Sequence, residues 1–377
     1  IDKVELRRRN HIQPAALPFK AASGMTYDSG AFTKVLDRAL AASDWAGYAA
    51  RQAESKARGR VRGRGLGAYL EVTGGPSKEM GGLRFEPDGT VTFLTGTLDY
   101  GQGHLTPIAQ VLLGKLGIPP DRLRLVQGDS DRLLAGGGTG GSRSITMSGA
   151  AALLAADKVI ENGRKIAAHA LEAAAADIEF ADGRFAIAGT DRSIGILELA
   201  ERLRAGLKLP PDLPQTLDAD AVHDGVPSSF PNGCHVCEVE IDPETGKVDV
   251  VRYASVNDFG TIVNPMLVAG QVHGGVVQGI GQALMEEARY DQESGQLLTG
   301  SYMDYALPRA GDAPNIQFFS EPDPAKTNPL GTKGCGEAGC AGALPAVMNA
   351  VVDALSAYGV KHLDMPATPE KVWQAIR

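Results

Sequence analysis

The amino-acid sequence predicts an α+β protein with two mixed α/β subdomains. Apolar residues recur at helical spacing in some stretches and alternate with polar residues in others, so both helices and strands are expected. These patterns form two comparable blocks, separated by a segment at residues 205–230 that is rich in Pro and Asp. Two blocks of strands and helices without a short repeat are typical of an α+β arrangement with at least two subdomains.

The first region, residues 1–56, is charged and irregular. Its one helical pattern is at 31–43, where the sequence is AFTKVLDRALAAS. We expect this region to be a connector that leans on a missing N-terminal half or on a partner chain. The two blocks then predict a subdomain over 57–230 and a second subdomain over 231–377.

In the second region, strand composition at 91–100 is followed by helical spacing of apolar residues at 104–117. A further strand is expected over 121–129, and a long Ala-rich helix over 148–175. The Pro- and Asp-rich segment that ends this region is expected to cross the surface.

The third region begins with two alternating stretches, 235–242 and 247–256, joined by the turn sequence PETG. This pattern predicts a β-hairpin. A helix is expected over 265–288, provided that a neighbour packs closely on its glycines, and a last helix over 341–355.

Composition excludes several classes of partner. The chain has 37 Lys and Arg against 45 Asp and Glu, a net charge of −8, which argues against nucleic acid or an anionic membrane surface. No run of 18 apolar residues predicts a membrane span. The four Cys are too few for a disulfide scaffold, so we expect a reducing, cytoplasmic location. The start at Ile1, without a signal-peptide pattern, suggests a piece of a longer chain.

The first candidate site is the turn Gly101-Gln102-Gly103 between a predicted strand and helix. It is close to a dinucleotide fingerprint, with Asp129 as the ribose-binding acid, but the third glycine position holds Thr106. A plain tight turn is a second interpretation. A third is an anion site, because backbone N–H groups at a helix N-terminus attract phosphate.

A second glycine loop, GGGTGGSRS at residues 136–144, precedes the Ala-rich helix. Successive glycine N–H groups can bind an anion, Ser142 and Ser144 add hydroxyl donors, and Arg143 adds charge. The alternative is a flexible, solvated loop.

The third candidate is GTKGCGEAGC at 331–340, which holds one carboxylate, Glu337, between Cys335 and Cys340. Glu337 can be a metal ligand, a catalytic base or a solvated turn residue. A zinc site that joins these thiols to Cys234 and Cys237 is the weaker hypothesis, because an offset of three along a strand points the latter two to opposite faces. Isolated His residues, such as His104, His235 and His273, are expected in the core or on the surface.

Together these stretches resemble one family. The motifs occur in the order found in molybdenum hydroxylases of the xanthine dehydrogenase, aldehyde oxidoreductase and carbon monoxide dehydrogenase type: TGTLDYGQGHLTPIAQ, GDSDRLLAGGGTGGSRS, NDFGTIVNPMLVAGQVHGG, SYMDYALPRA and NPLGTKGCGEAGCAGALPAVMNAV. The resemblance covers nearly the whole chain. It matches only the C-terminal half of the family's molybdopterin-binding large subunit.

The resemblance assigns roles to individual residues. Glu337 matches the family's catalytic base, and Cys335 and Cys340 depart from the small residues expected beside it. No protein ligand to the metal is expected. The residues that match cofactor-binding positions are Gly101, Gln102, Gly103, Gly141, Ser142, Arg143, Ser144 and Gln271.

The resemblance also implies cofactors and partners. The cofactor is molybdopterin, with or without an attached nucleotide, carrying molybdenum. Iron–sulfur clusters and FAD are expected on separate iron–sulfur and flavin subunits, and the N-terminal half of the large subunit is a further partner. The expected activity is hydroxylation of an aldehyde or aromatic N-heterocycle with water as the oxygen source. The alternatives are oxidation of carbon monoxide and a non-catalytic structural or assembly subunit.

Overall fold

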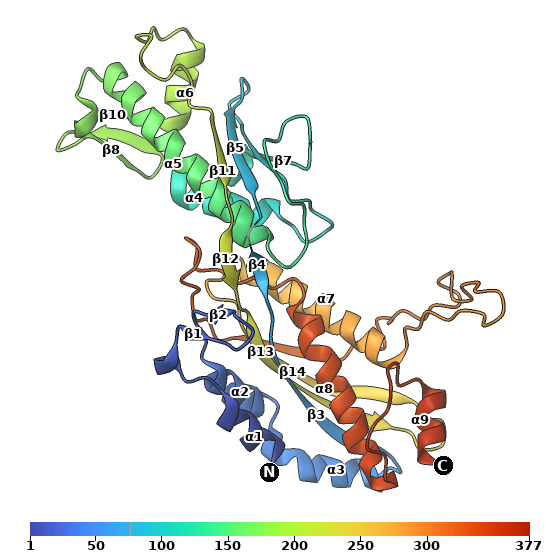
Figure 1. The fold of residues 1–377 in the computed structure, drawn as a ribbon. Helices are drawn as coiled ribbons and strands as arrows, with labels where there is room; N and C mark the ends of the chain where they lie inside the picture. Colours follow the sequence, from blue (N-terminus) through green and yellow to red (C-terminus); the bar gives the residue numbers. More distant parts are fainter. Residues whose placement is uncertain (76) are drawn as a thin grey trace.

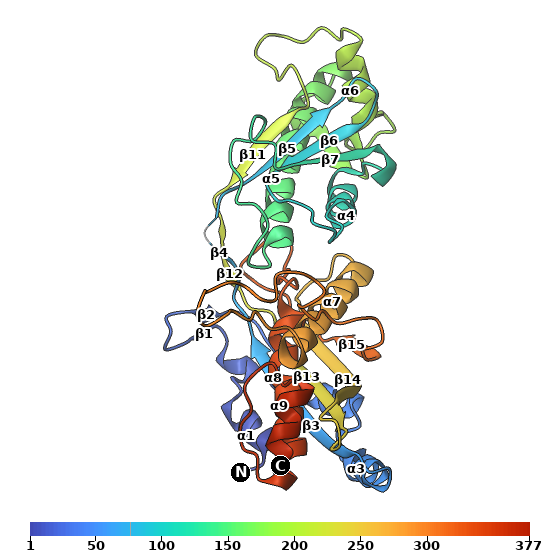
Figure 2. The ribbon, with the colours of Figure 1, turned by 90° about the vertical axis from the view of Figure 1, so that its right-hand side faces the viewer.

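The computed structural model describes residues 1–75 and 77–377. The chain forms two lobes, one above the other in Figure 1, each with its own sheet and helices. A narrow antiparallel ribbon of β4 (Thr73–Gly75) and β12 (Val226–Ser229) joins them, and Figure 2 shows the same separation from the side. The predicted α+β class with two mixed subdomains is confirmed.

The lower lobe is built on a four-stranded sheet in the order β15-β14-β13-β3. The predicted hairpin is present as the antiparallel pair β13–β14, while β15 runs parallel to β14. Every residue of β13 is buried, because helices cover both faces of the sheet. The strands are β3 (Val61–Leu70), β13 (Asn232–Ile241), β14 (Val248–Asp258) and β15 (Ile316–Ser320).

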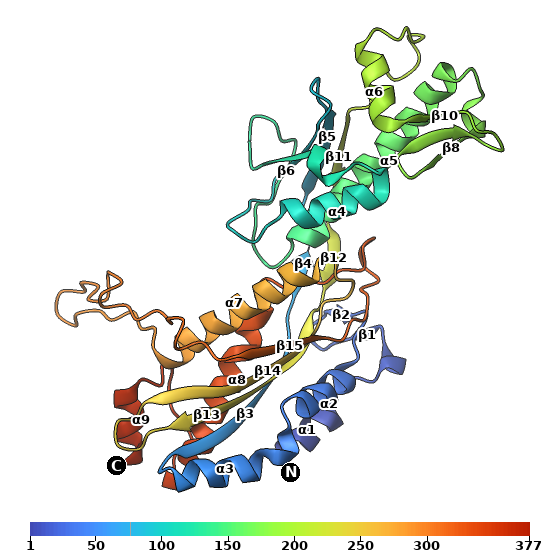
Figure 3. The same ribbon diagram turned by 180° about the vertical axis from the view of Figure 1, so that it is seen from behind.

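Two long helices cover one face of this sheet, and the N-terminal helices cover the other (Figure 3). Cys237 belongs to the hydrophobic core on the first face and Cys234 to the core on the second, so these cysteines do point to opposite faces. The helices are α1 (Lys3–Asn10), α2 (Phe32–Ala42), α3 (Tyr48–Ala57), α7 (Pro265–Leu284), α8 (Ala338–Leu355) and the C-terminal α9 (Pro369–Ile376).

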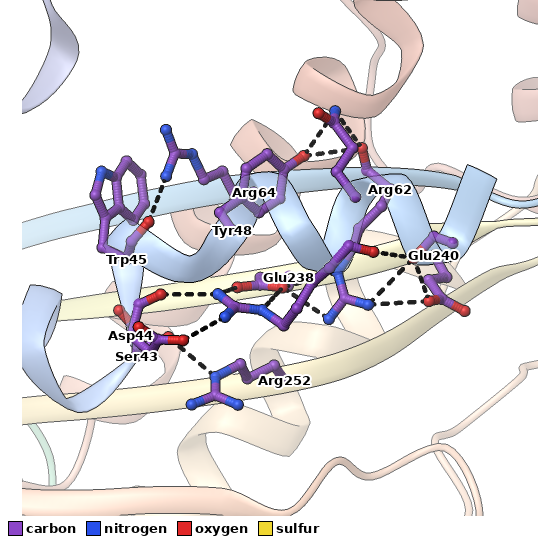
Figure 4. A network of polar contacts seen from close by, with 12 residues as sticks. Ser43, Asp44, Trp45, Tyr48, Arg62, Arg64, Glu238, Glu240 and Arg252 are labelled. Atoms are coloured by element: carbon purple, nitrogen blue, oxygen red, sulfur yellow. Dashed lines mark hydrogen bonds and ion pairs between the residues drawn. The ribbon is translucent and has the colours of Figure 1, made fainter. Parts of the chain in front are cut away.

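Helix α3 is bound to the sheet through the buried carboxylates of Glu238 and Glu240, as Figure 4 shows in part. Arg62 of β3 donates to Glu238 at 2.8 Å and to Glu240 at 3.0 Å. From α3, Arg51 donates to Glu238 and Ser55 donates to Glu240 at 2.6 Å. The first 56 residues therefore rest on a sheet of their own chain.

The upper lobe contains a second four-stranded sheet, in the order β11-β5-β6-β7, packed against the long helix α5. Its strands are β5 (Glu79–Phe85), β6 (Val91–Thr95), β7 (Leu123–Gln127) and β11 (Ala219–His223). Its helices are α4 (Leu105–Leu116), α5 (Ser144–Ala170) and α6 (Ile196–Arg204), and a small outer sheet consists of β8 (Ile178–Ala181), β9 (Arg184–Ile187) and β10 (Ser193–Gly195). A short hairpin of β1 (Phe19–Lys20) and β2 (Thr26–Tyr27) lies near the ribbon between the lobes.

The lobes do not follow the limits expected from the sequence at residues 56 and 230. β3 lies in the lower sheet, paired with β13 along its full length, and the chain enters the upper lobe only after β4. The segment 205–230, expected to cross the surface, contributes β11 to the upper sheet and β12 to the ribbon. These strands form because partner strands distant in sequence supply their hydrogen bonds, which local composition does not reveal.

Helix α8 has the length and hydropathy of a membrane-spanning helix, yet 56% of its most apolar window is buried inside the protein. It packs against β3, β13 and α7. These contacts make it a core helix of the lower lobe.

Three glycines on one face of β3 allow α8 to approach closely: Gly63, Gly65 and Gly67. A Cβ atom at Gly65 would lie 2.0 Å from the carbonyl oxygen of Ala346, and neither backbone can move away easily. We expect Gly65→Ala to lower the free energy of unfolding by about 1–3 kcal/mol, the usual cost of overpacking.

Gly114→Ala is the matched control for this prediction. Gly114 lies within α4 with no atom within 4 Å of its added Cβ, so the same change should stabilise the helix by about 0.5–1 kcal/mol. The measurement is urea unfolding of the purified protein. Equal stability of Gly65→Ala and wild type would contradict the close packing of α8 on β3.

Candidate functional site

A cavity of ≈ 570 Å³ lies between the two lobes. The upper lobe contributes the turn before α4 and the glycine loop before α5, and the lower lobe contributes the segment from β14 into α7 and the loop before α8. The cavity therefore brings together all three glycine-containing motifs that the sequence singled out.

The turn Gly101-Gln102-Gly103 is held by Asp99. This carboxylate accepts hydrogen bonds from the N–H groups of Gly101 at 2.8 Å, Gly103 at 3.1 Å and His104 at 2.7 Å. Partial burial of Asp99 opposes its ionisation, but these three donors together lower its pKa. Gly101 and Gly103 have φ of +108° and +75°, a conformation that favours glycine.

The side chain of Gln102 is used within its own turn, where its amide donates to the Leu98 carbonyl at 3.1 Å. His104, at the start of α4, also lines the cavity and contacts Gln127, with 3.0 Å between Nδ1 and the amide nitrogen. Burial lowers the pKa of His104, although the nearby charge of Asp99 opposes this shift. The lowered pKa favours the neutral ring.

The second glycine loop is joined to the first turn by Thr139, whose hydroxyl donates to the Leu98 carbonyl at 2.6 Å. Gly140 and Gly141 have open space where a side chain would be. Ser142 adopts a left-handed conformation with φ of 50°, which is uncommon for a residue with a Cβ atom. The Arg143 guanidinium donates to the Gly137 carbonyl and so closes the loop on itself.

Glu337 and Ser142 meet across the boundary between the lobes. The Ser142 hydroxyl donates to Glu337 Oε2 at 2.7 Å, and the Glu337 N–H donates to the same hydroxyl at 3.0 Å. Gly334 makes this contact possible, because a Cβ atom there would lie 1.8 Å from the Ser142 carbonyl oxygen. The first turn of α8 thus places a carboxylate at the cavity wall.

Four helices begin at this cavity. Residues at the N-termini of α4, α5, α7 and α8 all belong to its lining. Each N-terminus carries the positive end of the helix dipole, and Asp99 and Asn264 accept hydrogen bonds from N–H groups at the starts of α4 and α7. The arrangement favours an anionic ligand.

The cavity floor carries a buried ion pair. Lys333 donates to Asp258 at 2.5 Å, and both side chains are fully buried. Asp258 also accepts from Asn232 at 3.0 Å and from the Gly260 N–H at 2.9 Å. The charge of Lys333 is therefore neutralised by the protein and serves to anchor the loop that carries Glu337.

The predicted site residues are brought together with two exceptions. Gly101, Gln102, Gly141, Ser142, Ser144, Gln271 and Glu337 line the cavity. Gly103 lies just behind the lining, where it packs against Leu267, and the Arg143 side chain turns toward Gly137.

Sequence reasoning missed Glu71, the residue that follows β3. The Ser142 hydroxyl lies 3.2 Å from Glu71 Oε1, so it stands between the carboxyl groups of Glu71 and Glu337. Burial and the charge of Glu337 raise the pKa of Glu71 to about 7, although the Ser142 hydroxyl opposes them. No sequence signal marks Glu71, because nearly 270 residues separate it from Glu337.

The alternatives from the sequence find no support in this geometry. In the described part of the chain, no three His, Cys, Asp or Glu side chains gather as a metal site. For the dinucleotide interpretation, β6, α4 and β7 do form one parallel β-α-β unit. However, β5 pairs antiparallel with β6, and β11 pairs antiparallel with β5. Asp129 is not part of the cavity lining. His235 is buried and hydrogen bonded, with 2.8 Å between Nδ1 and the Tyr253 hydroxyl.

Comparison with known proteins gives a consistent result. Residues 38–314 match the family model described as the molybdopterin cofactor-binding domain. The carbon monoxide dehydrogenase large chain of Hydrogenophaga pseudoflava is 36% identical over 392 residues, a match that covers 100% of this chain and 48% of that one.

Two solved structures share the fold closely. Carbon monoxide dehydrogenase from Oligotropha carboxidovorans matches with a TM-score of 0.90 and 34% identity, over 100% of this chain and 48% of that one. Quinoline 2-oxidoreductase from Pseudomonas putida 86 matches with a TM-score of 0.90 and 35% identity, over 99% and 49%. The chain spans about half the length of the relatives it matches.

Proposed function

Because the chain belongs to the molybdopterin cofactor-binding domain family, we propose that its interlobe cavity binds molybdopterin and that Glu337 is the catalytic base of an oxidoreductase. The family resemblance inferred from the sequence is thereby confirmed. The observation that carries the proposal is the position of Glu337. Its carboxylate, at the N-terminus of α8, lines a cavity surrounded by glycine loops and helix N-termini.

The residues of the cavity fit the cofactor. A pterin that bears a phosphate needs hydrogen-bond donors without bulky side chains, and Gly140 and Gly141 leave open space beside backbone N–H groups. The N-termini of four helices favour the negative charge of the phosphate. Ser144 and Gln271 add side-chain donors to the same lining.

In this proposal the residues of the chain bind and orient the cofactor, and they move a proton. The bound molybdenum cofactor supplies the two-electron redox chemistry. Glu337 accepts the proton that is released when water-derived oxygen attacks the substrate carbon. The Ser142 hydroxyl and the α8 N-terminus fix the orientation of its carboxylate. General-base catalysis of this kind contributes roughly 10²–10⁴-fold.

We propose a carbon centre as the site of hydroxylation, in an aldehyde or an aromatic N-heterocycle. The similarity to quinoline 2-oxidoreductase supports the heterocycle. Oxidation of carbon monoxide is the second candidate, favoured by the similarity to carbon monoxide dehydrogenase over the whole chain. A non-catalytic structural or assembly subunit is the rival that the measurements below exclude or support.

We propose the remaining half of a large subunit, an iron–sulfur subunit and a flavin subunit as partners. An arm between α7 and β15 extends away from the lower lobe and carries highly exposed side chains, among them Tyr302 at 84% and Met303 at 93%. Apolar side chains so exposed are typical of residues that a partner covers. All four cysteines are free thiols, which supports the proposed cytoplasmic location.

The experiment that tests cofactor binding is Arg143→Ala in the assembled complex. Its guanidinium closes the second glycine loop, and the loss of a charged hydrogen bond costs about 1.5–3 kcal/mol. We expect pterin and molybdenum to be lost on gel filtration while the complex stays assembled.

Arg164→Ala is the matched control, because Arg164 is an exposed arginine of α5, the helix that follows Arg143. It should retain the cofactor. Full retention by Arg143→Ala would show that Arg143 is not needed to hold the cofactor, and molybdenum missing from every wild-type preparation would favour the non-catalytic rival.

A further inference from the structure

The least explained group near the cavity is Glu71. It lies at the end of β3, where its N–H donates to the Pro231 carbonyl at 3.0 Å, and its Oε1 lies 3.2 Å from the Ser142 hydroxyl. Glu71 is not among the residues that line the cavity, so it acts on that site only through its neighbours.

The hydroxyl of Ser142 has one proton and two carboxyl groups beside it. It lies 2.7 Å from Glu337 Oε2 and 3.2 Å from Glu71 Oε1, and its oxygen already accepts the Glu337 N–H. A single hydroxyl donor can satisfy only one of two ionised carboxylates. The other oxygen of Glu71, Oε2, is buried without a hydrogen-bond partner in the described part of the chain.

In the described part of the chain, the titratable groups that interact with Glu71 supply no positive charge. The titratable groups that interact with it are Glu337, Cys335, Cys340 and Tyr69, all neutral or negative. Burial and the nearby Glu71 raise the pKa of the Cys335 thiol to about 12. Among the described residues, no Lys, Arg or His contributes to the titration of Glu71. Two negative charges here are unfavourable.

We propose that Glu71 and Glu337 form a carboxyl pair, bridged by the Ser142 hydroxyl, that holds one proton on Glu71 and keeps Glu337 ionised and oriented toward the cavity. Glu71 is then a positioning residue for the base. This inference rests on the proposed role of Glu337 and adds a partner to it. The raised pKa of Glu71, about 7, agrees with a protonated group at and below neutral pH.

The first test is infrared spectroscopy of the assembled complex, with or without its cofactor. Protonated carboxyl groups absorb apart from carboxylates, so Glu71 should give a band that disappears with a midpoint near pH 7. The band should be missing in Glu71→Gln. A wild-type complex without such a band, or a band that survives in Glu71→Gln, overturns the proposal whether or not the complex holds molybdenum.

The second test is the pH dependence of single-turnover reduction by substrate. In wild type, Glu71 that ionises above pH 7 competes with Glu337 for the single Ser142 hydroxyl proton, so Glu337 loses its orientation and the rate should fall with the midpoint seen in the infrared. Glu71→Gln, which cannot ionise, should lose this transition. Glu79→Gln is the control, because Glu79 is also a buried Glu with a raised pKa but bonds to Thr95 and Gly96, and the transition should survive.

A further variant keeps the proposal testable if Glu71→Gln does not assemble. The Ser142 hydroxyl stabilises ionised Glu71, so Ser142→Ala should move the midpoint of the infrared band to higher pH. An unchanged or lower midpoint overturns the bridge. If the infrared band behaves as expected while substrate does not reduce the complex, the carboxyl pair stands and the proposed catalytic function fails.

Discussion

Glu337→Gln is expected to abolish reduction of the complex by substrate while the cofactor stays bound. Glutamine has nearly the same volume as glutamate and can still accept the Ser142 hydroxyl proton through its carbonyl oxygen. It cannot act as a base at neutral pH. The rate of the chemical step should therefore fall at least about 10²-fold.

The measurement is single-turnover reduction at saturating substrate, normalised to molybdenum. Glu286→Gln is the matched control, since Glu286 follows α7, accepts a hydrogen bond from Tyr305 at 2.8 Å, and does not line the cavity. A Glu337→Gln rate within about threefold of wild type, less than one hydrogen bond is worth, would remove Glu337 from the chemistry.

Gly334→Ala should reduce the same rate by about 10²-fold without removing any functional group. The added methyl would lie 1.8 Å from the Ser142 carbonyl oxygen, so the loop that carries Glu337 must move away from Ser142. Displacement of a catalytic group by about 1 Å can cost 10²-fold in rate.

Gly114→Ala is the control for this variant. Gly114 lies within α4, does not line the cavity, has no atom within 4 Å of its added Cβ, and does not need a positive φ. It should assemble and react like wild type. If Gly334→Ala also reacts like wild type, then the close contact between the two loops does not position Glu337.

Much of the fold could be predicted because local patterns agree with the final structure. The helix expected at 31–43 is α2, the helix expected at 265–288 is α7, and the hairpin at 235–256 is β13–β14. In α2 the apolar positions that define the pattern, Val35, Leu36 and Ala39, are those that become buried. The amphipathic period is a property of the segment itself, so it is visible without knowledge of the partner.

Pairings between distant segments could not be predicted. β3 reads as the start of the second region, yet its glycines face α8, nearly 280 residues away, and its partner is β13. The chain therefore passes between the two lobes twice. A division of the sequence into consecutive regions does not describe the lobes. Sheet order depends on long-range hydrogen bonding, which composition and local spacing do not encode.

The candidate site shows the same division. Glycine loops and Glu337 could be recognised because each belongs to a contiguous motif, and the cavity does bring them together. Glu71 could not, because only the fold places it against Ser142. The orientation of Arg143 toward Gly137 is likewise a result of how the loop closes, which its position in the motif does not reveal.

The most direct test of the account is the location of molybdenum in crystals of the assembled complex, by anomalous scattering at the molybdenum absorption edge. The account predicts one strong peak in each copy, inside the cavity lined by Gln102, Ser144 and Glu337. A peak outside this cavity, or substrate-oxidising activity in a complex whose crystals contain no molybdenum, would contradict it.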